Sequence, residues 1–350
     1  MTGSSPLRVL ISPDKFRGTL TGREASDAME RGVRQAAERG EFDALCTLIP
    51  LADGGEGTLD AFGGANRESV VTGPLGQPVS APWRLDGNRA VIEMSLASGL
   101  ALAGGATSND PLAATTRGTG ELILAAVDTG ARDILIGVGG SATTDGGAGA
   151  LQVLAPDGGP SLLSVDVCMT VCADVRTGFL DAATVFGPQK GATSAQVQEL
   201  SDRLKALHED YLRRFGIDLA SVESAGAAGG LAGGLAAIGA QLVPGFDMIA
   251  ELFGFDTALG AADLVITGEG FFDATSLDGK VVGGVIERAR LAAVPTLVVC
   301  GGADSDVAIP DGVSVISLTD DFGVDAALQS AAACVTRAVD GYLANGIARV

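Results

Sequence analysis

The chain has 350 residues, of which 47% are hydrophobic and 19% are charged, and its formal net charge is −20. At roughly 150 residues per domain this length is too great for one ordinary core, so we expect two domains. The acidity argues against a nucleic-acid-binding protein, because no basic stripe is present to neutralise phosphates.

Strands alternate with helices near both ends of the chain. A buried-type strand over residues 7–12 precedes a helix over about 22–39, which begins with the capping-box pair Thr21 and Glu24. A second strand is predicted over 44–51, and β-branched runs at 296–300 and 313–318 lie among helical segments. This alternation predicts a parallel, doubly wound sheet, with the strands at 7–12 and 296–300 in the same sheet.

The middle of the chain has a different pattern. A hairpin is predicted over 79–94, with its turn at Asp86-Gly87-Asn88. A helix over 120–128, strands over 133–138 and 166–174 and a long amphipathic helix over 194–215 follow. We therefore predict an α/β protein with two domains. Residues 1–75 and 285–350 form a Rossmann-like domain, residues 76–284 form an inserted mixed α/β domain, and the active site lies in the cleft between them.

Three features bear on location. Residues 225–246 carry no charge, but seven of them are glycine, so this segment is too weakly hydrophobic to span a membrane. The N-terminus has no apolar signal run. The five cysteines show no metal-binding spacing and are predicted to be buried free thiols in a reducing compartment. We expect a cytoplasmic protein without membrane or nucleic-acid partners.

Glycine turns combine with charged or hydroxyl residues in four segments. The chain contains 51 glycines, and these turns lie at residues 12–19, 52–58, 137–147 and 267–270. Ligands of open α/β sheets bind at the carboxyl ends of strands, where glycine lets backbone amides approach an anion. Any one of these turns could need glycine for its dihedral angles alone, but four of this kind indicate a ligand site.

The lysines are few and their placement is uneven. The chain has four lysines among 23 basic residues. Lys15, Lys190 and Lys280 lie in glycine-bounded segments, whereas Lys205 lies on the solvent side of the predicted long helix. We expect at least two of the three lysines in turns to contact phosphate. Lys190 is expected to present an exposed ammonium.

Several catalytic classes lack their motifs. The phosphate-binding motif GxxxxGK[ST] does not occur, and residues 137–142 lack the third glycine of a dinucleotide-binding turn. The single histidine, His208, flanks the apolar stripe of the long helix and is expected at the surface, which excludes hydrolysis with a histidine base. A carboxylate or lysine must then act as any general base. This suits phosphoryl transfer, which depends mainly on positioning and charge neutralisation.

The motifs resemble those of the bacterial glycerate kinase family, of the glycerate 2-kinase type. They run along nearly the whole chain: SPDKFRGTL at 12–20, PLADGGEGT at 50–58, GPLG at 73–76, IEMSLASGL at 92–100, GTGELI at 118–123, GVGGSATTDGG at 137–147, FGPQKGA at 186–192, GAAGG at 226–230 and DLVITGEG at 263–270. The resemblance implies a two-domain α/β kinase that phosphorylates glycerate with ATP and Mg²⁺, at the 2-hydroxyl. It implies glycerate and ATP as partners, and we expect a monomer or homodimer.

Roles for the matching polar residues are our inference. Asp174 takes or orients the hydroxyl proton, Lys190 and Lys280 contact the transferring phosphate, and Glu269 and Asp273 hold Mg²⁺. The substrate-binding residues are Asp14, Arg17, Asp53 and Glu56. The residues that bind phosphate or ATP are Gly139, Gly140, Ser141, Asp145 and Gln189.

The sequence departs from the family pattern at three places. Phe271 stands where arginine is usual and Thr275 where glutamine is expected. The segment 175–179, which follows Asp174, lacks an Asn-Pro pair that is common in the family. Arg176 of this segment is a candidate substitute for the arginine that Phe271 replaces. Residues 154–164 look shortened. These changes keep two alternatives open: a kinase for another short hydroxy acid, and a non-catalytic small-molecule-binding relative.

Overall fold

The computed structural model describes residues 5–156, 166–277 and 280–346. The chain divides into two compact units, one formed by the residues up to Ala52 together with those from Phe246 onward, and the other by Asp53–Gly245. The sequence placed these boundaries after residues 75 and 284 instead. The observed boundaries differ from the predicted ones because residues 67–72 and 78–86 form two strands of the second unit's sheet, whereas residues 264–272 form a strand of the first unit's sheet.

The first unit contains a parallel five-stranded sheet with the order β11-β10-β9-β1-β2. Its strands are β1 (Leu7–Ile11), β2 (Ala44–Leu48), β9 (Leu264–Phe272), β10 (Thr296–Ala303) and β11 (Val313–Ser317). The prediction that the first strand and the strand at residue 296 share one parallel sheet is confirmed. The intervening β9 pairs with both of them.

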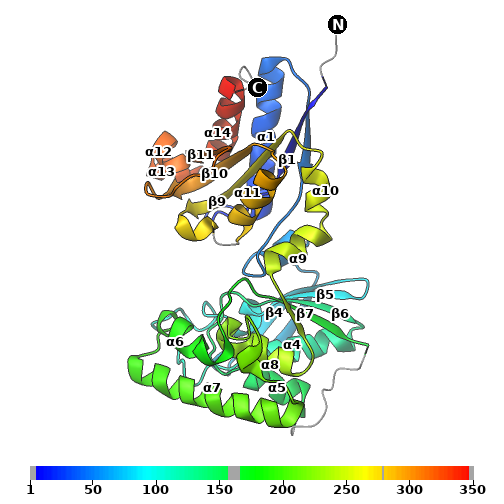
Figure 1. Ribbon diagram of the computed structural model, residues 1–350, viewed down its shortest axis with the longest axis vertical. Coiled ribbons are helices and arrows are strands. Elements are labelled where there is room, and N and C mark those ends of the chain that lie inside the picture. Colours follow the sequence, from blue (N-terminus) through cyan, green and yellow to red (C-terminus); the bar gives the residue numbers. More distant parts are fainter. Residues whose placement is uncertain (1–4, 157–165, 278–279, 347–350) are drawn as a thin grey trace. The chain divides into compact units, whose positions relative to one another are not determined.

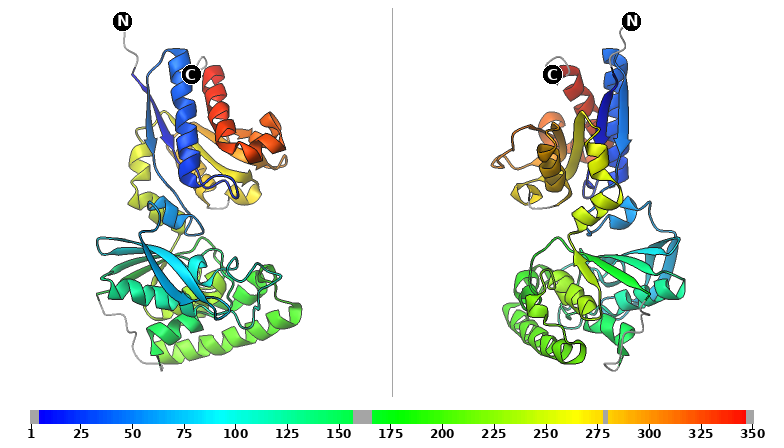
Figure 2. Two further views of the ribbon diagram at one scale, coloured as in Figure 1. Left: turned by 180° about the vertical axis from the view of Figure 1, so that it is seen from behind. Right: turned by 45° about the vertical axis from the view of Figure 1, so that its right-hand side comes forward.

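Helices cover both faces of this sheet, as a doubly wound fold requires. On one face α1 and α14 pack side by side (Figures 1 and 2), and a Cβ at Gly32 would lie 2.6 Å from the Thr336 carbonyl oxygen. On the other face, Val282 and Ile286 of α11 share a core with Val298 and Cys300 of β10. The helices of this part of the chain are α1 (Gly22–Gly40), α9 (Gly245–Leu252), α10 (Phe255–Leu259), α11 (Val281–Leu291), α12 (Leu318–Phe322), α13 (Val324–Gln329) and α14 (Ala331–Gly346).

The second unit contains a mixed six-stranded sheet with the order β3-β4-β5-β6-β7-β8. Its strands are β3 (Arg67–Thr72), β4 (Pro78–Asp86), β5 (Arg89–Glu93), β6 (Asp133–Gly137), β7 (Cys168–Cys172) and β8 (Gln241–Val243). The predicted hairpin is present, because β4 and β5 pair antiparallel across the turn at Gly87. From β5 to β8 the neighbouring strands are parallel.

Helices of the second unit bury the sheet and one another. Leu122 of α4 and Leu154 of α5 join the main core of the sheet, while Leu204 and Tyr211 of the long helix α7 pack with Phe179 in a second core. Figure 2 shows α7 running along one side of this unit. The helices are α2 (Thr58–Ala61), α3 (Ser95–Ser98), α4 (Arg117–Asp128), α5 (Ala148–Leu154), α6 (Ala182–Phe186), α7 (Ser194–Phe215) and α8 (Leu231–Ala237).

The charge-free segment at residues 225–246 folds into a 3₁₀ turn, the fully buried helix α8 and strand β8. Within the described residues, no helix is long and apolar enough to cross a membrane. All five cysteines are free thiols, as predicted. Their predicted burial is wrong for two of them, since Cys168 is exposed and Cys46 is only half-buried.

Candidate functional site

In the first unit, the carboxyl ends of β1 and β9 mark the point where the strand order changes direction. The chain passes from β1 to β2 on one side, and from β9 to β10 and β11 on the other. Ligands of open α/β sheets bind outside the strands at such a point. The loop after β1 is fixed there, because the Asp14 amide donates to the Gly268 carbonyl oxygen at 2.8 Å.

Glu269 is the half-buried carboxylate at this edge. Burial raises the pKa of Glu269 to about 7; the Ser276 hydroxyl and Lys280 oppose the rise, and Asp14 and Asp273 add to it. Its Oε1 atom is buried and accepts no hydrogen bond from the part of the chain that the structure describes. A buried acceptor without a donor is costly, so this oxygen is suited to receive a cation or a ligand hydroxyl.

Asp273 lies in the turn that follows β9. Its Oδ1 accepts hydrogen bonds from the Thr275 amide at 2.8 Å, the Thr275 hydroxyl at 2.6 Å and the Ser276 amide at 3.2 Å. Thr275, one of the departures from the family pattern, therefore helps to fix the Asp273 carboxylate. These hydrogen bonds lower the pKa of Asp273, the Thr275 hydroxyl most.

The carboxylates at this edge fit one kind of metal site. Among residues 5–156, 166–277 and 280–346, no group of three or more histidine, cysteine, aspartate and glutamate side chains is arranged to hold a metal ion. A closed protein cage is thus absent from the described chain. Mg²⁺ is commonly held by one or two carboxylates together with substrate phosphates and water. Oε1 of Glu269, which has no donor among the described residues, and the nearby Asp273 suit that arrangement.

Cations accompany these carboxylates. The Lys15 ammonium lies 3.6 Å from Oδ1 of Asp14. Arg17 is exposed and its backbone lies against β9, since a Cβ at Gly270 would be 2.9 Å from the Arg17 amide nitrogen. Lys280 is exposed and acts electrostatically on Glu269. The first unit therefore holds a mixed cluster of acids and bases at one strand edge.

In the second unit, the loop at residues 53–57 packs on the carboxyl ends of β6 and β7. Gly54 has φ +81°, and a Cβ there would lie 2.4 Å from Cβ of Cys172. A Cβ at Gly137 would lie 2.5 Å from the Gly54 carbonyl oxygen. This loop can approach the strands so closely only because both positions are glycine.

Asp53 and Asp174 come together beside this loop. The charges of both carboxylates help to raise the pKa of the Cys172 thiol, although burial is the main cause. Oδ1 of Asp174 accepts the Gly245 amide at 2.7 Å, and a Cβ at Gly245 would lie 2.2 Å from the Asp53 carbonyl oxygen. Two of the predicted site carboxylates, about 120 residues apart in the sequence, are therefore neighbours.

Glu93 is a residue that the sequence reasoning missed. Its carboxylate, 4% exposed, accepts hydrogen bonds from the Gly57 amide at 3.0 Å and the Leu59 amide at 2.6 Å. Burial raises the pKa of Glu93, and the two amides oppose that shift. The side chain ties the loop at residues 53–57 to the end of β5. An acidic residue directly after the apolar run at residues 90–92 was the available signal.

The turn after β6 lies against the same loop. A Cβ at Gly139 would be 2.6 Å from Cα of Gly55, and Ser141 is 8% exposed. Gly140 and Glu56 are exposed. Gly139, Gly140, Ser141 and Glu56 thus border the region of Asp53, as a ligand-binding edge would require.

Lys190 is buried, which differs from the exposed ammonium predicted for its turn. Its side chain is 3% exposed, and Nζ donates to the Thr143 carbonyl oxygen at 2.5 Å. Burial lowers the pKa of Lys190 to about 7, while Asp145 opposes this shift. The Asn109 side chain also bridges the carbonyl oxygens of Lys190 and Ala142. These contacts attach the Lys190 turn to the loop that follows β6.

The Asp145 carboxylate accepts hydrogen bonds that fix the same loop. It accepts hydrogen bonds from the amide and hydroxyl of Thr116, each at 2.8 Å, and from the amides of Gly147 and Gly149, each at 3.1 Å. Burial raises the pKa of Asp145 despite these donors. Both oxygens are engaged in fixing α4 and α5 to the loop.

Comparison with known proteins shows which family the chain belongs to. The sequence matches the glycerate kinase family over residues 9–157 and 161–344. The chain belongs to the glycerate kinase family. It is 38% identical to the glycerate 2-kinase of Escherichia coli over 337 residues, covering 87% of each chain. It is 40% identical to the glycerate kinase of Bacillus subtilis over 334 residues, covering 86% of each chain.

A solved structure agrees with this assignment to the glycerate kinase family. The crystal structure of a Salmonella typhimurium protein assigned as glycerate kinase 2 matches with a TM-score of 0.81 at 33% identity. The match covers 98% of this chain and 99% of that one. The predicted α/β fold and family are therefore confirmed, and the chain is an enzyme of the phosphotransferase class.

In this glycerate kinase family member the predicted site residues form separate groups. Asp14, Arg17, Glu269, Asp273 and Lys280 gather in the first unit. Asp53, Glu56, Gly139, Gly140, Ser141 and Asp174 gather in the second, where Lys190 and Asp145 support the loop and Gln189 is exposed. The expectation that all of them share one cleft concerns both units and stays a prediction.

Two further expectations concern side chains outside these groups. His208 was expected at the surface, but its side chain is only 17% exposed, and Nε2 lies 3.6 Å from Asp218. Arg176, the candidate substitute cation, is 91% exposed and lies 3.5 Å from Glu223.

Proposed function

We propose that this chain transfers the γ-phosphoryl group of ATP to the 2-hydroxyl of glycerate, giving 2-phosphoglycerate. The observation that carries the proposal is the half-buried Glu269 at the switch point of the parallel sheet, whose Oε1 accepts no hydrogen bond from any described residue. Relatives over most of the chain are named glycerate 2-kinase and glycerate kinase, which supports glycerate as the acceptor.

The first unit supplies the groups that handle the phosphates. Glu269 and Asp273 would hold Mg²⁺, which when bound neutralises charge on the phosphate oxygens. Lys280 contacts the transferring phosphoryl group, where negative charge must be stabilised in the transition state. Arg17 binds the glycerate carboxylate through its two parallel N–H donors. Asp14 orients Lys15 through their ion pair and accepts a hydrogen bond from a hydroxyl group of glycerate.

The second unit supplies the carboxylate for the acceptor hydroxyl. The Gly245 amide holds Asp174, which accepts the proton or orients the hydroxyl for attack. Asp53 and Glu56 bind the remaining hydroxyl of glycerate. The amides of Gly139 and Gly140 and the Ser141 hydroxyl assist at a phosphate oxygen, because glycine-rich turns present backbone amides to anions.

Lys190 and Asp145 act in a different way from the residues that bind ligands. Because Lys190 is buried and bonded to Thr143, we assign it the role of positioning the loop that carries Ser141 rather than of contacting phosphate. Asp145 holds the other end of that loop through Thr116 and two glycine amides. Gln189, on the exposed side of the same turn, is the member of this segment that reaches a phosphate.

A turnover assay tests the proposal. ATP consumption would be measured with glycerate, glycolate, lactate and tartronate, and the products identified by ³¹P and ¹H NMR. We expect glycerate to be preferred and 2-phosphoglycerate to form. Glu269→Gln should lower kcat by roughly 10²-fold, the scale of losing one preorganised electrostatic group. Glu287→Gln, at a carboxylate of α11 that is 58% exposed and paired with Arg290, is the matched control and should leave turnover unchanged.

The other outcomes correspond to the alternatives. Turnover of a different acid would favour a kinase for that hydroxy acid, to which the exposed Phe271 could contribute. Binding of ATP and glycerate without turnover would indicate a non-catalytic relative. Formation of 3-phosphoglycerate would reassign the accepting hydroxyl but leave the phosphoryl transfer intact.

A further inference from the structure

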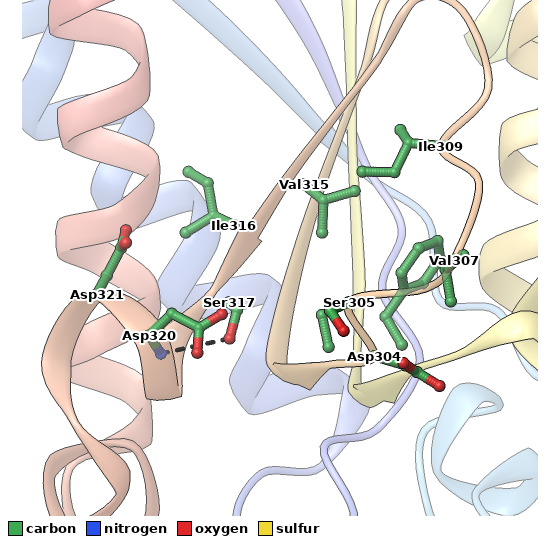
Figure 3. Close-up of a pocket in the computed structure, with 11 residues that line it drawn as sticks. Asp304, Ser305, Val307, Ile309, Val315, Ile316, Ser317, Asp320 and Asp321 are labelled. Carbon is green, nitrogen blue, oxygen red and sulfur yellow. Dashed lines mark hydrogen bonds between the residues drawn. The ribbon is translucent and has the colours of Figure 1, made fainter.

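A pocket of about 500 Å³ lies in the first unit, next to the end of β11. Figure 3 shows its two kinds of lining. Val307, Ile309 and Val315 form an apolar wall, and Asp304 and Asp320 lie along its lower side. The pocket is of the size that small-molecule sites have, and it combines an apolar surface with a few polar groups.

The charges of the lining decide which part of a ligand can enter. Three carboxylates border the pocket, those of Asp304, Asp320 and Asp321, and no lysine or arginine does among the residues lining it. A phosphate group would be repelled there. A neutral, planar base would be accepted by the apolar wall, and hydroxyl groups of a sugar would find carboxylate acceptors.

The position of the pocket relates it to Glu269. The Asp304 amide donates to the Phe272 carbonyl oxygen at 2.9 Å, which joins the pocket to the last residue of β9. Phe272 lies three residues beyond Glu269, which corresponds to about 10 Å along a strand. An extended triphosphate chain can span this separation.

We propose that this pocket binds the nucleoside part of ATP. The adenine ring packs against Val307, Ile309 and Val315, and the ribose hydroxyls donate to Asp304, whose amide is bonded to the last residue of β9. Oδ1 of Asp304 already accepts the Asp306 amide at 3.1 Å, which fixes its orientation. The phosphates then extend from the acidic pocket toward Glu269 and Lys280. This assignment rests on the proposed use of ATP.

Paired binding measurements on the full chain test the assignment. ADP carries the nucleoside and two phosphates, whereas inorganic pyrophosphate carries the phosphates alone. Ile309→Glu places a charge at the apolar wall on a side chain that is 51% exposed, so folding should be preserved. By titration calorimetry we expect Ile309→Glu to weaken ADP binding at least tenfold and to leave pyrophosphate binding unchanged.

Matched variants and kinetics complete the test. Val324→Glu changes a 59% exposed valine of α13 that does not line the pocket, and it should bind ADP like the unmodified chain. If Ile309→Glu does not fold, Asp304→Ala replaces it, with the same expected split. In turnover assays the KM for ATP should rise about tenfold, while kcat and the KM for glycerate stay constant.

The outcomes separate the two proposals. If the unmodified chain neither binds ADP nor consumes ATP, the proposed function fails. If the unmodified chain binds ADP but Ile309→Glu binds it equally well, the pocket assignment alone is wrong. An equal weakening of ADP and pyrophosphate would also overturn it, because the variant would then act on the phosphate site.

Discussion

Replacing Lys190 by methionine should change how the stability of the second unit depends on pH. Methionine keeps the apolar stem but removes the amino group that donates to the Thr143 carbonyl oxygen. Burial lowers the pKa of Lys190 from 10.5 to about 7 in the folded chain. Between these two values the unfolded chain binds a proton at this lysine that the folded chain has released.

The sign and size follow from proton linkage. Where the unfolded state binds more protons, the free energy of unfolding rises with pH, by about 1.4 kcal/mol per pH unit for one proton. Lys190 therefore adds stability as the pH increases from about 7 toward 10.5. Relative to Lys190→Met, the unmodified chain should gain roughly 2–3 kcal/mol between pH 7.5 and pH 9.5.

Urea unfolding followed by tryptophan fluorescence measures this difference. Trp83 is the single tryptophan of the chain, is 2% exposed and lies in the same unit as Lys190, so its emission reports the unfolding of that unit. Lys205→Met is the matched control, since that ammonium is 60% exposed on α7. The reasoning is refuted if the difference between the unmodified chain and Lys190→Met stays constant across this pH range.

Two further predictions concern the loop at residues 53–57. Gly54→Ala should destabilise the second unit by at least about 2 kcal/mol, because its Cβ would clash with Cys172, whereas Gly64→Ala, with φ +79° and open space around it, should cost only about 1 kcal/mol. Equal urea midpoints for the two variants would contradict this. Glu93→Ala leaves the half-buried Gly57 amide and the buried Leu59 amide without their acceptor and should cost roughly 1–3 kcal/mol, whereas Glu93→Gln keeps an oxygen acceptor and should cost less. A Glu93→Ala variant as stable as Glu93→Gln would show that these two hydrogen bonds do not secure the loop.

Local signals predicted the regular elements well. Both long helices begin at a capping box, Thr21 with Glu24 and Thr193 with Gln196, and the apolar stripe that follows fixes how they pack. The hairpin around Gly87 was predicted from its turn residues. In each of these cases the information lies within a few residues, so the sequence alone reveals it.

Long-range pairing was harder to predict. The sequence predicted a glycine turn at residues 267–270, but this prediction is wrong, because these residues lie within strand β9. Nothing local shows that this strand inserts between β1 and β10. The position of the unit boundaries depends on that pairing. Lys190 illustrates the same limit for side chains, because glycines on both sides fix a turn without revealing whether the lysine points inward or outward.

The distribution of charge in the first unit favours one orientation of a bound nucleotide. A chain with a net charge of −20 repels a nucleotide overall, so it must offset its own field where phosphates bind. In the first unit, Lys15 lies beside Asp14, and the charge of Lys280 opposes the rise in the pKa of Glu269. The charged residues that line the pocket next to β11 are all aspartates. A nucleotide can lie with its phosphates toward the lysines and its uncharged nucleoside in the acidic pocket. In this orientation the phosphates meet positive charge and avoid the carboxylates. The reverse orientation would set phosphate against three carboxylates, and the acidic pocket therefore helps to direct the γ-phosphate toward Glu269.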